Sequence, residues 1–186
     1  RICKLVDRFE VFSERPPIER DAVNIHEVLE HVIRLARTGF GATVHIKELY
    51  DPSLPPVYGN RDELIQIFLN LVKNAVEAAP SEGGEVTVST AYQQGFRIAV
   101  PGTESQVDLP LVVGVQDNGP GIPDSLQRQI FDPFITTKMG GSGLGLALVA
   151  KLVGEHGGVI DVESKPRRTL FRVMLPLMKR KEKQDG

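Results

Sequence analysis

The sequence has one cysteine and no long apolar run. Cys3 has no partner for an internal disulfide, and a cysteine-rich zinc site cannot form. A chain of this kind is expected in a reducing, cytoplasmic compartment. The longest apolar stretch, residues 109–115, is far shorter than the roughly 20 residues that a transmembrane helix needs. We therefore expect no membrane-spanning segment and no membrane partner.

The chain also has no large excess of charge. It carries 22 Lys and Arg against 24 Asp and Glu, a formal net charge of −2, which argues against a dedicated nucleic-acid binder. The hydrophobic content of 41% is that of an ordinary globular protein. A length of 186 residues allows one domain with an appendage. Because the chain starts at Arg1 without a methionine, we expect it to be a piece of a longer protein.

Hydrophobic periodicity predicts a mixture of helices and strands without strict alternation. Helices are predicted at 1–13, 25–38, 62–79, 124–130 and 143–156, strands at 43–49, 85–91, 111–116, 159–163 and 169–175, and a hairpin with a long surface loop at 92–110. This order favours an α/β fold of the two-layer sandwich type over a doubly wound sheet. Residues 1–20 are expected to be a helix end and linker, 21–178 the domain, and 179–186 a charged tail.

The predicted helix 62–79 is apolar over most of its circumference. At 100° per residue, its polar side chains fall within an arc of about 100°. They are Glu63, Gln66, Asn70, Lys73, Asn74 and Glu77. Such a stripe is either a solvated edge or a slot for an oxygen-rich ligand, in which amide groups bind Mg²⁺ and phosphate.

Two further segments combine glycine with groups that bind ligands. Residues 117–122, Asp-Asn-Gly-Pro-Gly-Ile, follow an apolar strand. They form either a good turn or a site where a carboxylate accepts from an adenine amine and glycines admit a flat ligand. Residues 140–146 open onto a helix N-terminus, which is a site for anions, yet they lack the Gly-Lys-Ser/Thr ending of a P-loop. The irregular residues 131–138 between these segments suggest a mobile lid, with Lys138 available to phosphate.

Taken in order, these segments resemble the N, G1, F and G2 boxes of the histidine-kinase ATP-binding domain, a Bergerat-fold (GHKL) family related to gyrase, Hsp90 and MutL. The matching motifs are Asn70-x-x-x-Asn74, Asp117-x-Gly119-x-Gly121, Phe131-x-x-Phe134 and Gly141-x-Gly143-Leu144-Gly145-Leu146. The resemblance covers about residues 22–177. Residues 51–55 and 66–75, with the long insert before the G1-like motif, look most like nitrogen-regulation sensor kinases of the NtrB type.

The resemblance implies that the domain binds ATP with Mg²⁺ and transfers the γ-phosphoryl group to a histidine. By similarity, Asn74 would coordinate Mg²⁺, Asn70 and Lys73 would face the phosphates, and Asp117 would accept from the adenine amine. The remaining implied groups are the adenine slot (Gly119, Gly121, Ile122, Thr169), the lid (Phe134, Thr136, Thr137, Lys138) and backbone amides at the phosphates (Gly141, Gly143, Leu144, Gly145, Leu146). The residues expected to take part in catalysis are Asn70, Lys73, Asn74 and Lys138.

The chain departs from the family pattern in two places. Many sensor kinases carry a basic residue three positions after the second asparagine, where this chain has Glu77; we expect Lys73 to compensate. No histidine has the setting of a phosphoacceptor, and His31 and His156 are interpreted as ordinary surface or helix-end residues. The acceptor is therefore expected upstream, on a dimerising hairpin whose second helix ends in residues 1–13.

The implied partners are this histidine-bearing hairpin of the same protein, a response regulator and, by resemblance only, a PII-type protein. The full-length protein would be a homodimer. Two alternatives stay open, a Bergerat-fold ATPase and a non-catalytic nucleotide-binding module. Hydrolysis is disfavoured because Asn70 stands where the related ATPases have a glutamate that activates water, and an amide is no general base.

Overall fold

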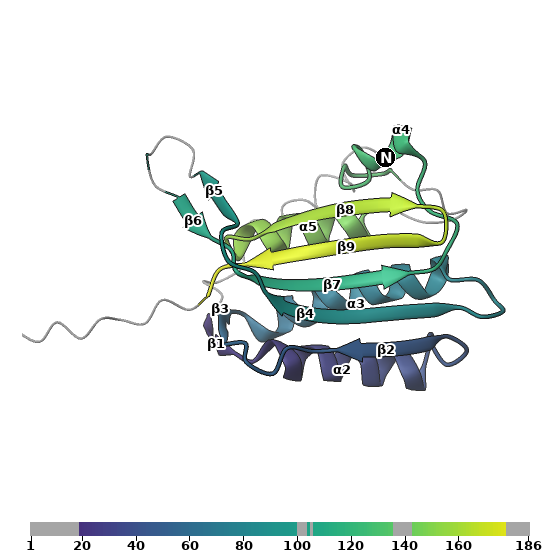
Figure 1. The fold of residues 1–186 in the computed structure, drawn as a ribbon, viewed down its shortest axis with the longest axis horizontal. Coiled ribbons are helices and arrows are strands. Elements are labelled where there is room, and N and C mark those ends of the chain that lie inside the picture. Colours follow the sequence, from purple (N-terminus) through teal and green to yellow (C-terminus); the bar gives the residue numbers. More distant parts are fainter. Residues whose placement is uncertain (1–18, 100–103, 105, 136–142, 178–186) are drawn as a thin grey trace, which may run out of the picture.

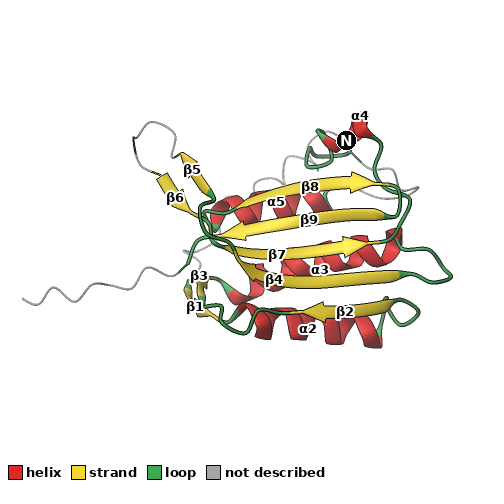
Figure 2. Ribbon diagram, in the orientation of Figure 1, coloured by secondary structure: helices red, strands yellow, loops and turns green. Residues whose placement is uncertain are grey.

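A five-stranded mixed sheet forms one layer, and three helices cover one of its faces (Figures 1 and 2). This computed structural model describes residues 19–99, 104, 106–135 and 143–177. The strand order is β2 (His45–Leu49), β4 (Glu85–Tyr92), β7 (Leu111–Asp117), β9 (Arg168–Leu175) and β8 (Val159–Lys165). Only the β2–β4 pair is parallel within this sheet. The architecture confirms the predicted two-layer α/β sandwich.

The covering helices are α2 (Ile25–Thr38), α3 (Arg61–Ala78) and α5 (Gly145–Glu155). Asparagine caps begin the first two, since the side chain of Asn24 accepts from the His26 amide and that of Asn60 accepts from the Glu63 amide, each at 3.0 Å. The strands alternate as predicted: Val86 and Val88 of β4 are fully buried between helices and sheet. One main apolar core therefore joins the two layers.

Several elements differ from the sequence-based prediction. The sequence did not indicate β1 (Asp21–Val23) and β3 (Val57–Gly59), which pair antiparallel with each other. Strands of three residues are too short to show a period, so only the tertiary pairing reveals them. The short helix α4 (Asp124–Gln127) ends three residues early, and α5 starts at Gly145 because Gly143 has a positive φ of 68°.

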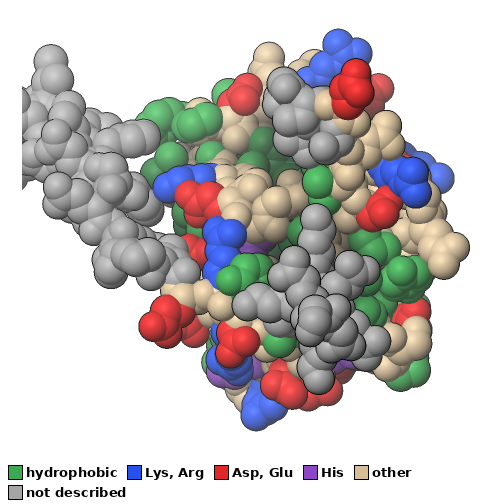
Figure 3. All heavy atoms as spheres, turned by 90° about the vertical axis from the view of Figure 1, so that its left-hand side faces the viewer, with side chains coloured by type: hydrophobic (Ala, Val, Ile, Leu, Met, Phe, Trp, Pro, Cys, Tyr) green, Lys and Arg blue, Asp and Glu red, His purple; other side chains and the backbone are tan. Residues whose placement is uncertain are grey.

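The predicted hairpin between β4 and β7 is present as β5 (Arg97–Ala99) and β6 (Gln106–Asp108) and projects from one end of the sheet (Figure 1). Its apolar side chains pack on a second, smaller cluster that contains Leu109, Val112 and Met174. On the face seen in Figure 3, acidic and basic side chains are interspersed, in keeping with the near-neutral net charge.

The predicted helix at 1–13 and the charged tail at 179–186 lie outside the described residues. Within the described ranges, none of the helices is both long enough and apolar enough to cross a membrane.

Candidate functional site

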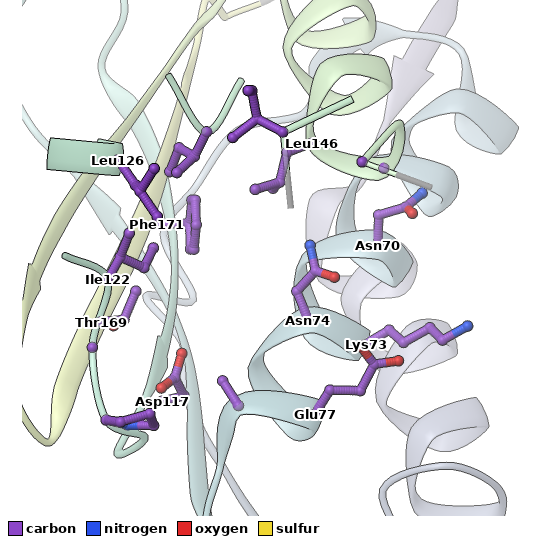
Figure 4. A pocket seen from close by; sticks show the side chains of 17 residues that line it. Asn70, Lys73, Asn74, Glu77, Asp117, Ile122, Leu126, Leu146, Thr169 and Phe171 are labelled. Atoms are coloured by element: carbon purple, nitrogen blue, oxygen red, sulfur yellow. The ribbon is translucent and has the colours of Figure 1, made fainter. Parts of the chain in front are cut away.

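A cavity of about 480 Å³ lies between α3, the loop after β7 and the start of α5 (Figure 4). It brings together polar and glycine residues that are up to 99 positions apart in the sequence. Eleven of the residues singled out from the sequence line it: Asn70, Lys73, Asn74, Glu77, Asp117, Gly121, Ile122, Gly143, Gly145, Leu146 and Thr169. The fold thus brings residues of the N, G1 and G2 motifs together on one side of the sheet, whereas Phe131 and Phe134 of the F motif do not line the cavity.

Asp117 lies at one end of this cavity, on the last residue of β7. The residue is only 4% exposed, and Oδ1 accepts a hydrogen bond of 2.8 Å from the amide of Gly119. Burial raises the pKa of Asp117, and the Gly119 hydrogen bond opposes this effect. Thr169 stands directly opposite on β9 and is equally buried. A strong acceptor and a hydroxyl therefore face the same part of the cavity (Figure 4).

The two glycines of the loop after β7, Gly119 and Gly121, are required by close contacts within the protein. A Cβ at Gly119 would collide with the carbonyl oxygen of Ala78 on α3, and Gly119 is buried without lining the cavity. Gly121 has φ = 91°, and a Cβ there would lie 2.9 Å from the carbonyl oxygen of Lys165. The lack of a Cβ at these glycines therefore lets the loop pack closely against α3 on one side and against the β8–β9 turn on the other.

Asn70 lies on α3 against the start of α5. Its Nδ2 donates to the carbonyl oxygen of Gln66 at 2.8 Å, and a Cβ on Gly145 would lie 3.3 Å from Oδ1. The side chain of the N-cap residue, Leu144, makes no capping hydrogen bond, and the first two residues of α5, Gly145 and Leu146, line the cavity at the positive end of the helix dipole. Amides and Asn70 together suit an anionic group at this end of the cavity.

Asn74 lies one turn further along α3, half-buried, with its amide directed into the cavity (Figure 4). Lys73 is exposed at the rim and extends away from Asn74 and Asp117 in this view. No group of three or more His, Cys, Asp or Glu side chains suited to a metal occurs in the described residues. An amide oxygen fits Mg²⁺ nevertheless, because this ion usually takes one or two protein oxygens and completes its shell with water and substrate phosphates.

The opposite wall of the cavity is apolar and was missed by sequence reasoning. It includes Leu126, Ile130, Ile135 and Phe171. Three of these are ordinary apolar residues in irregular or short segments, which nothing in the sequence marks as ligand-facing. Phe171 could have been found, because it lies two residues after Thr169 on the same face of β9.

A set of hydrogen bonds braces the loop after β7, and sequence reasoning missed these residues too. The amide of Ile122 donates to Ser164 Oγ at 2.8 Å. Gln127 Nε2 on α4 donates to the carbonyl oxygens of Ile122 (2.9 Å) and Ser164 (3.1 Å). The amide of Arg167 donates to the carbonyl oxygen of Gly119 at 2.8 Å. The far end of the β8–β9 hairpin thus holds the loop in place.

Other predicted site residues do not line the cavity. Glu63 belongs to the polar stripe of α3 by periodicity, but it is buried beside His156 at the end of α5. The part of the stripe that faces the cavity is therefore shorter than predicted. His156 is a helix-end residue as interpreted, yet it is buried. Phe134 and Leu144 are exposed. Thr136, Thr137, Lys138 and Gly141 lie outside the described residues.

Comparison with protein families matches residues 59–179 to the family described as histidine kinase-, DNA gyrase B-, and HSP90-like ATPase. The chain is similar to the sensory histidine kinase/phosphatase NtrB of Azospirillum brasilense, with 64% identity over 95% of this chain and 44% of that protein. The chain spans about half the length of the curated relatives that it matches.

Among solved structures, the fold is similar to that of a mycobacterial sensor histidine kinase, MprB. The TM-score is 0.69 at 26% identity, covering 85% of this chain and 97% of that one. A second match is full-length ShkA in complex with AMPPNP, with a TM-score of 0.71 at 25% identity, covering 90% of this chain and 33% of that one. These matches confirm the resemblance inferred from the four motifs and the predicted fold class.

Proposed function

Since this chain belongs to the histidine kinase-, DNA gyrase B-, and HSP90-like ATPase family and is of the NtrB type within it, we propose that it is the catalytic domain of a sensor histidine kinase. In this proposal it binds ATP with Mg²⁺ and transfers the γ-phosphoryl group to a histidine on a separate helical hairpin. The observation that carries the proposal is the cavity, which places a buried carboxylate, two asparagine amides and the N-terminus of α5 together.

Each part of the cavity suits one part of the nucleotide. Asp117 accepts a hydrogen bond from the adenine amine, and Ile122, Leu126 and Phe171 contact the ring through apolar surface. Asn70 and the first amides of α5 bind phosphate oxygens. Asn74 supplies an amide oxygen to Mg²⁺, and this ion, when bound, offsets charge on the phosphates.

Phosphoryl transfer in such a site depends on positioning and electrostatics rather than on a general base. Asn70 occupies the position from which a carboxylate would activate water, and an amide cannot do so. The domain therefore holds ATP for an external acceptor and hydrolyses it slowly. Lys138, Thr136, Thr137 and Gly141 are proposed to act at the phosphates, with Lys73 compensating for Glu77.

The proposed partners follow from the resemblance to sensor kinases of the NtrB type. The Azospirillum relative is a sensory histidine kinase/phosphatase. We propose a histidine-bearing hairpin of the same protein, a homodimer of the full-length chain, a response regulator that receives the phosphoryl group, and a PII-type regulator, in the cytoplasm. Residues 1–20 would join the domain to the hairpin.

The test combines binding and transfer. Titration calorimetry should detect Mg-ATP, and absence of heat at millimolar ATP would contradict the proposal. With γ-labelled ATP the chain alone should not label itself, whereas an added hairpin carrying the upstream histidine should become labelled. Asn74→Ala should abolish this labelling, while the exposed-site variant Ser125→Ala should retain it. Rapid ATP turnover without an acceptor would instead favour the ATPase.

A further inference from the structure

Three strands bring the side chains of Asp117, Thr169 and Ser164 into one row across the end of the sheet. Thr169 on β9 is the register partner of Asp117 on β7 and of Ser164 on β8. The hydroxyl groups of Ser164 and Thr169 are 2.7 Å apart. Asp117 and Thr169 line the cavity, whereas Ser164 stands behind Thr169 and does not.

Either hydroxyl could donate the Ser164–Thr169 hydrogen bond, and a second contact of Ser164, with the amide of Ile122, bears on its direction. The amide of Ile122 is a fixed donor, so Ser164 Oγ must accept from it at 2.8 Å. The Ser164 hydroxyl then has its own proton to place. Among the described residues, Thr169 Oγ1 is the one remaining hydrogen-bond partner recorded for Ser164 Oγ. Ser164 can place this proton on Thr169, and in that arrangement the hydrogen-bond chain runs from the Ile122 amide through Ser164 to Thr169.

In that arrangement Thr169 keeps its own hydroxyl proton. Because Thr169 Oγ1 already accepts from Ser164, its O–H is free to act as a donor on the cavity side of the residue. Asp117 next to it can only accept when ionised. The end of the cavity thus presents one acceptor and one donor, in a fixed order along the row.

We propose that Ser164 is a specificity-determining residue that sets the hydrogen-bond polarity of Thr169 and thereby selects adenine. This inference rests on the proposed ATP-binding function. The Watson–Crick edge of adenine offers an amine donor and a ring-nitrogen acceptor, which complement Asp117 and a donating Thr169. The 6-oxo purines carry an oxygen acceptor and an N–H donor at these two positions, so both contacts become mismatched.

The test compares the dissociation constants of Mg-ATP and Mg-ITP, measured by titration calorimetry. ITP differs from ATP by the 6-oxo group and the ring N–H. In Ser164→Ala the Thr169 hydroxyl can turn and accept, so the preference for ATP over ITP should fall by about three- to tenfold. Ser164→Thr keeps the hydroxyl and should restore the preference. Ser125→Ala on α4 is exposed and should leave it unchanged.

A purely structural role gives a different result. If Ser164 only braced the loop, Ser164→Ala would weaken ATP and ITP equally, and the unchanged ratio would overturn the inference. Thr169→Val removes the hydroxyl while keeping the shape, so it should lower the ratio by itself, and adding Ser164→Ala to it should lower the ratio no further.

Failure of the two proposals can be told apart. If the unmodified chain bound neither nucleotide, the proposed function itself would fail. If Asp117→Asn abolished the preference for ATP while Ser164→Ala and Thr169→Val left it intact, the ATP site would stand and only the role of Ser164 would be refuted.

Discussion

His156 Nε2 and Glu63 Oε2 lie 3.9 Å apart inside the core, where the end of α5 meets the first turn of α3. The amide of Asn60 donates to His156 Nε2 at 3.1 Å, so the ring proton is on Nδ1 and is donated to the Leu152 carbonyl oxygen at 2.8 Å. Neither carboxyl oxygen of Glu63 has a hydrogen-bond partner within the part of the chain that the structure describes. Through the Asn60 amide, His156 provides a polar link between the two helices that line the cavity.

His156→Ala should destabilise the fold. The Asn60 amide would lose its acceptor and a cavity would form behind Gly59, whose position for a Cβ lies 2.8 Å from the imidazole. We expect a loss of about 2–4 kcal/mol in the free energy of unfolding, from the unpaired amide and the lost packing together. Urea denaturation measures this loss. His45→Ala on β2 is the matched control, since His45 is exposed, and an equal loss in both variants would contradict the role of His156.

Two glycine-to-alanine substitutions should have opposite effects on stability. A Cβ at Gly119 meets the backbone of α3, so Gly119→Ala must displace the loop and should lower both the melting temperature and the affinity for ATP. A Cβ at Gly154, on the exposed side of α5, meets nothing within 4 Å. Gly154→Ala should therefore raise stability by about 0.5–1 kcal/mol. Differential scanning fluorimetry checks both, and a stabilising Gly119→Ala would show that the loop does not need its close packing on α3.

Asp117→Asn should weaken ATP binding by roughly 1.5–3 kcal/mol, the range for a hydrogen bond to a charged group. The amide keeps the shape of the carboxylate but presents a weaker acceptor and an unwanted donor. Calorimetric titration of the variant against the unmodified chain measures the change. Asp108→Asn, on the exposed β5–β6 hairpin, is the control and should bind ATP normally. Equal affinity of the unmodified chain for ATP and GTP would count against the adenine contact.

The same substitution should affect stability with a definite pH dependence. Burial raises the pKa of Asp117 in the folded state, so the folded chain binds a proton more readily than the unfolded chain. The ionised carboxylate therefore costs stability at neutral pH, and the cost disappears as the pH falls through the folded-state pKa. Asp117→Asn should melt at a higher temperature than the unmodified chain at pH 7, and the difference should shrink in acid. A difference in melting temperature that grows as the pH falls would contradict this prediction.

The helices on the main sheet and its strands were predictable because each shows its own period over five or more residues or carries a cap. Asn24 caps α2 as predicted, and β4 and β7 alternate or run apolar as buried strands do. The exceptions are instructive. β1 and β3 are three residues long and are stabilised by pairing with each other across 34 positions of sequence, which no local pattern reports.

The groups that make up the site were predictable for a different reason. Asn70, Asn74, Asp117 and the glycines before α5 are residue types that rarely serve a core, so their positions stood out in the sequence. Ser164 and Gln127 contact the loop and strand that line the site, but a serine at a strand end and a glutamine on a short helix are commonplace. Only their distances to Ile122 and Thr169 in the folded chain reveal what they contribute.

Periodicity by itself determined that Glu63 and Asn74 share one polar stripe of a helix, and the residue types determined which chemistry that stripe offers. Tertiary structure decided that the two side chains have different environments. The end of α5 covers the first turn of α3 and buries Glu63 against His156, while the fourth turn remains open and directs Asn74 into the cavity. The physical reason is that burial depends on which distant segment packs over a residue, and His156 lies 93 positions from Glu63 along the chain.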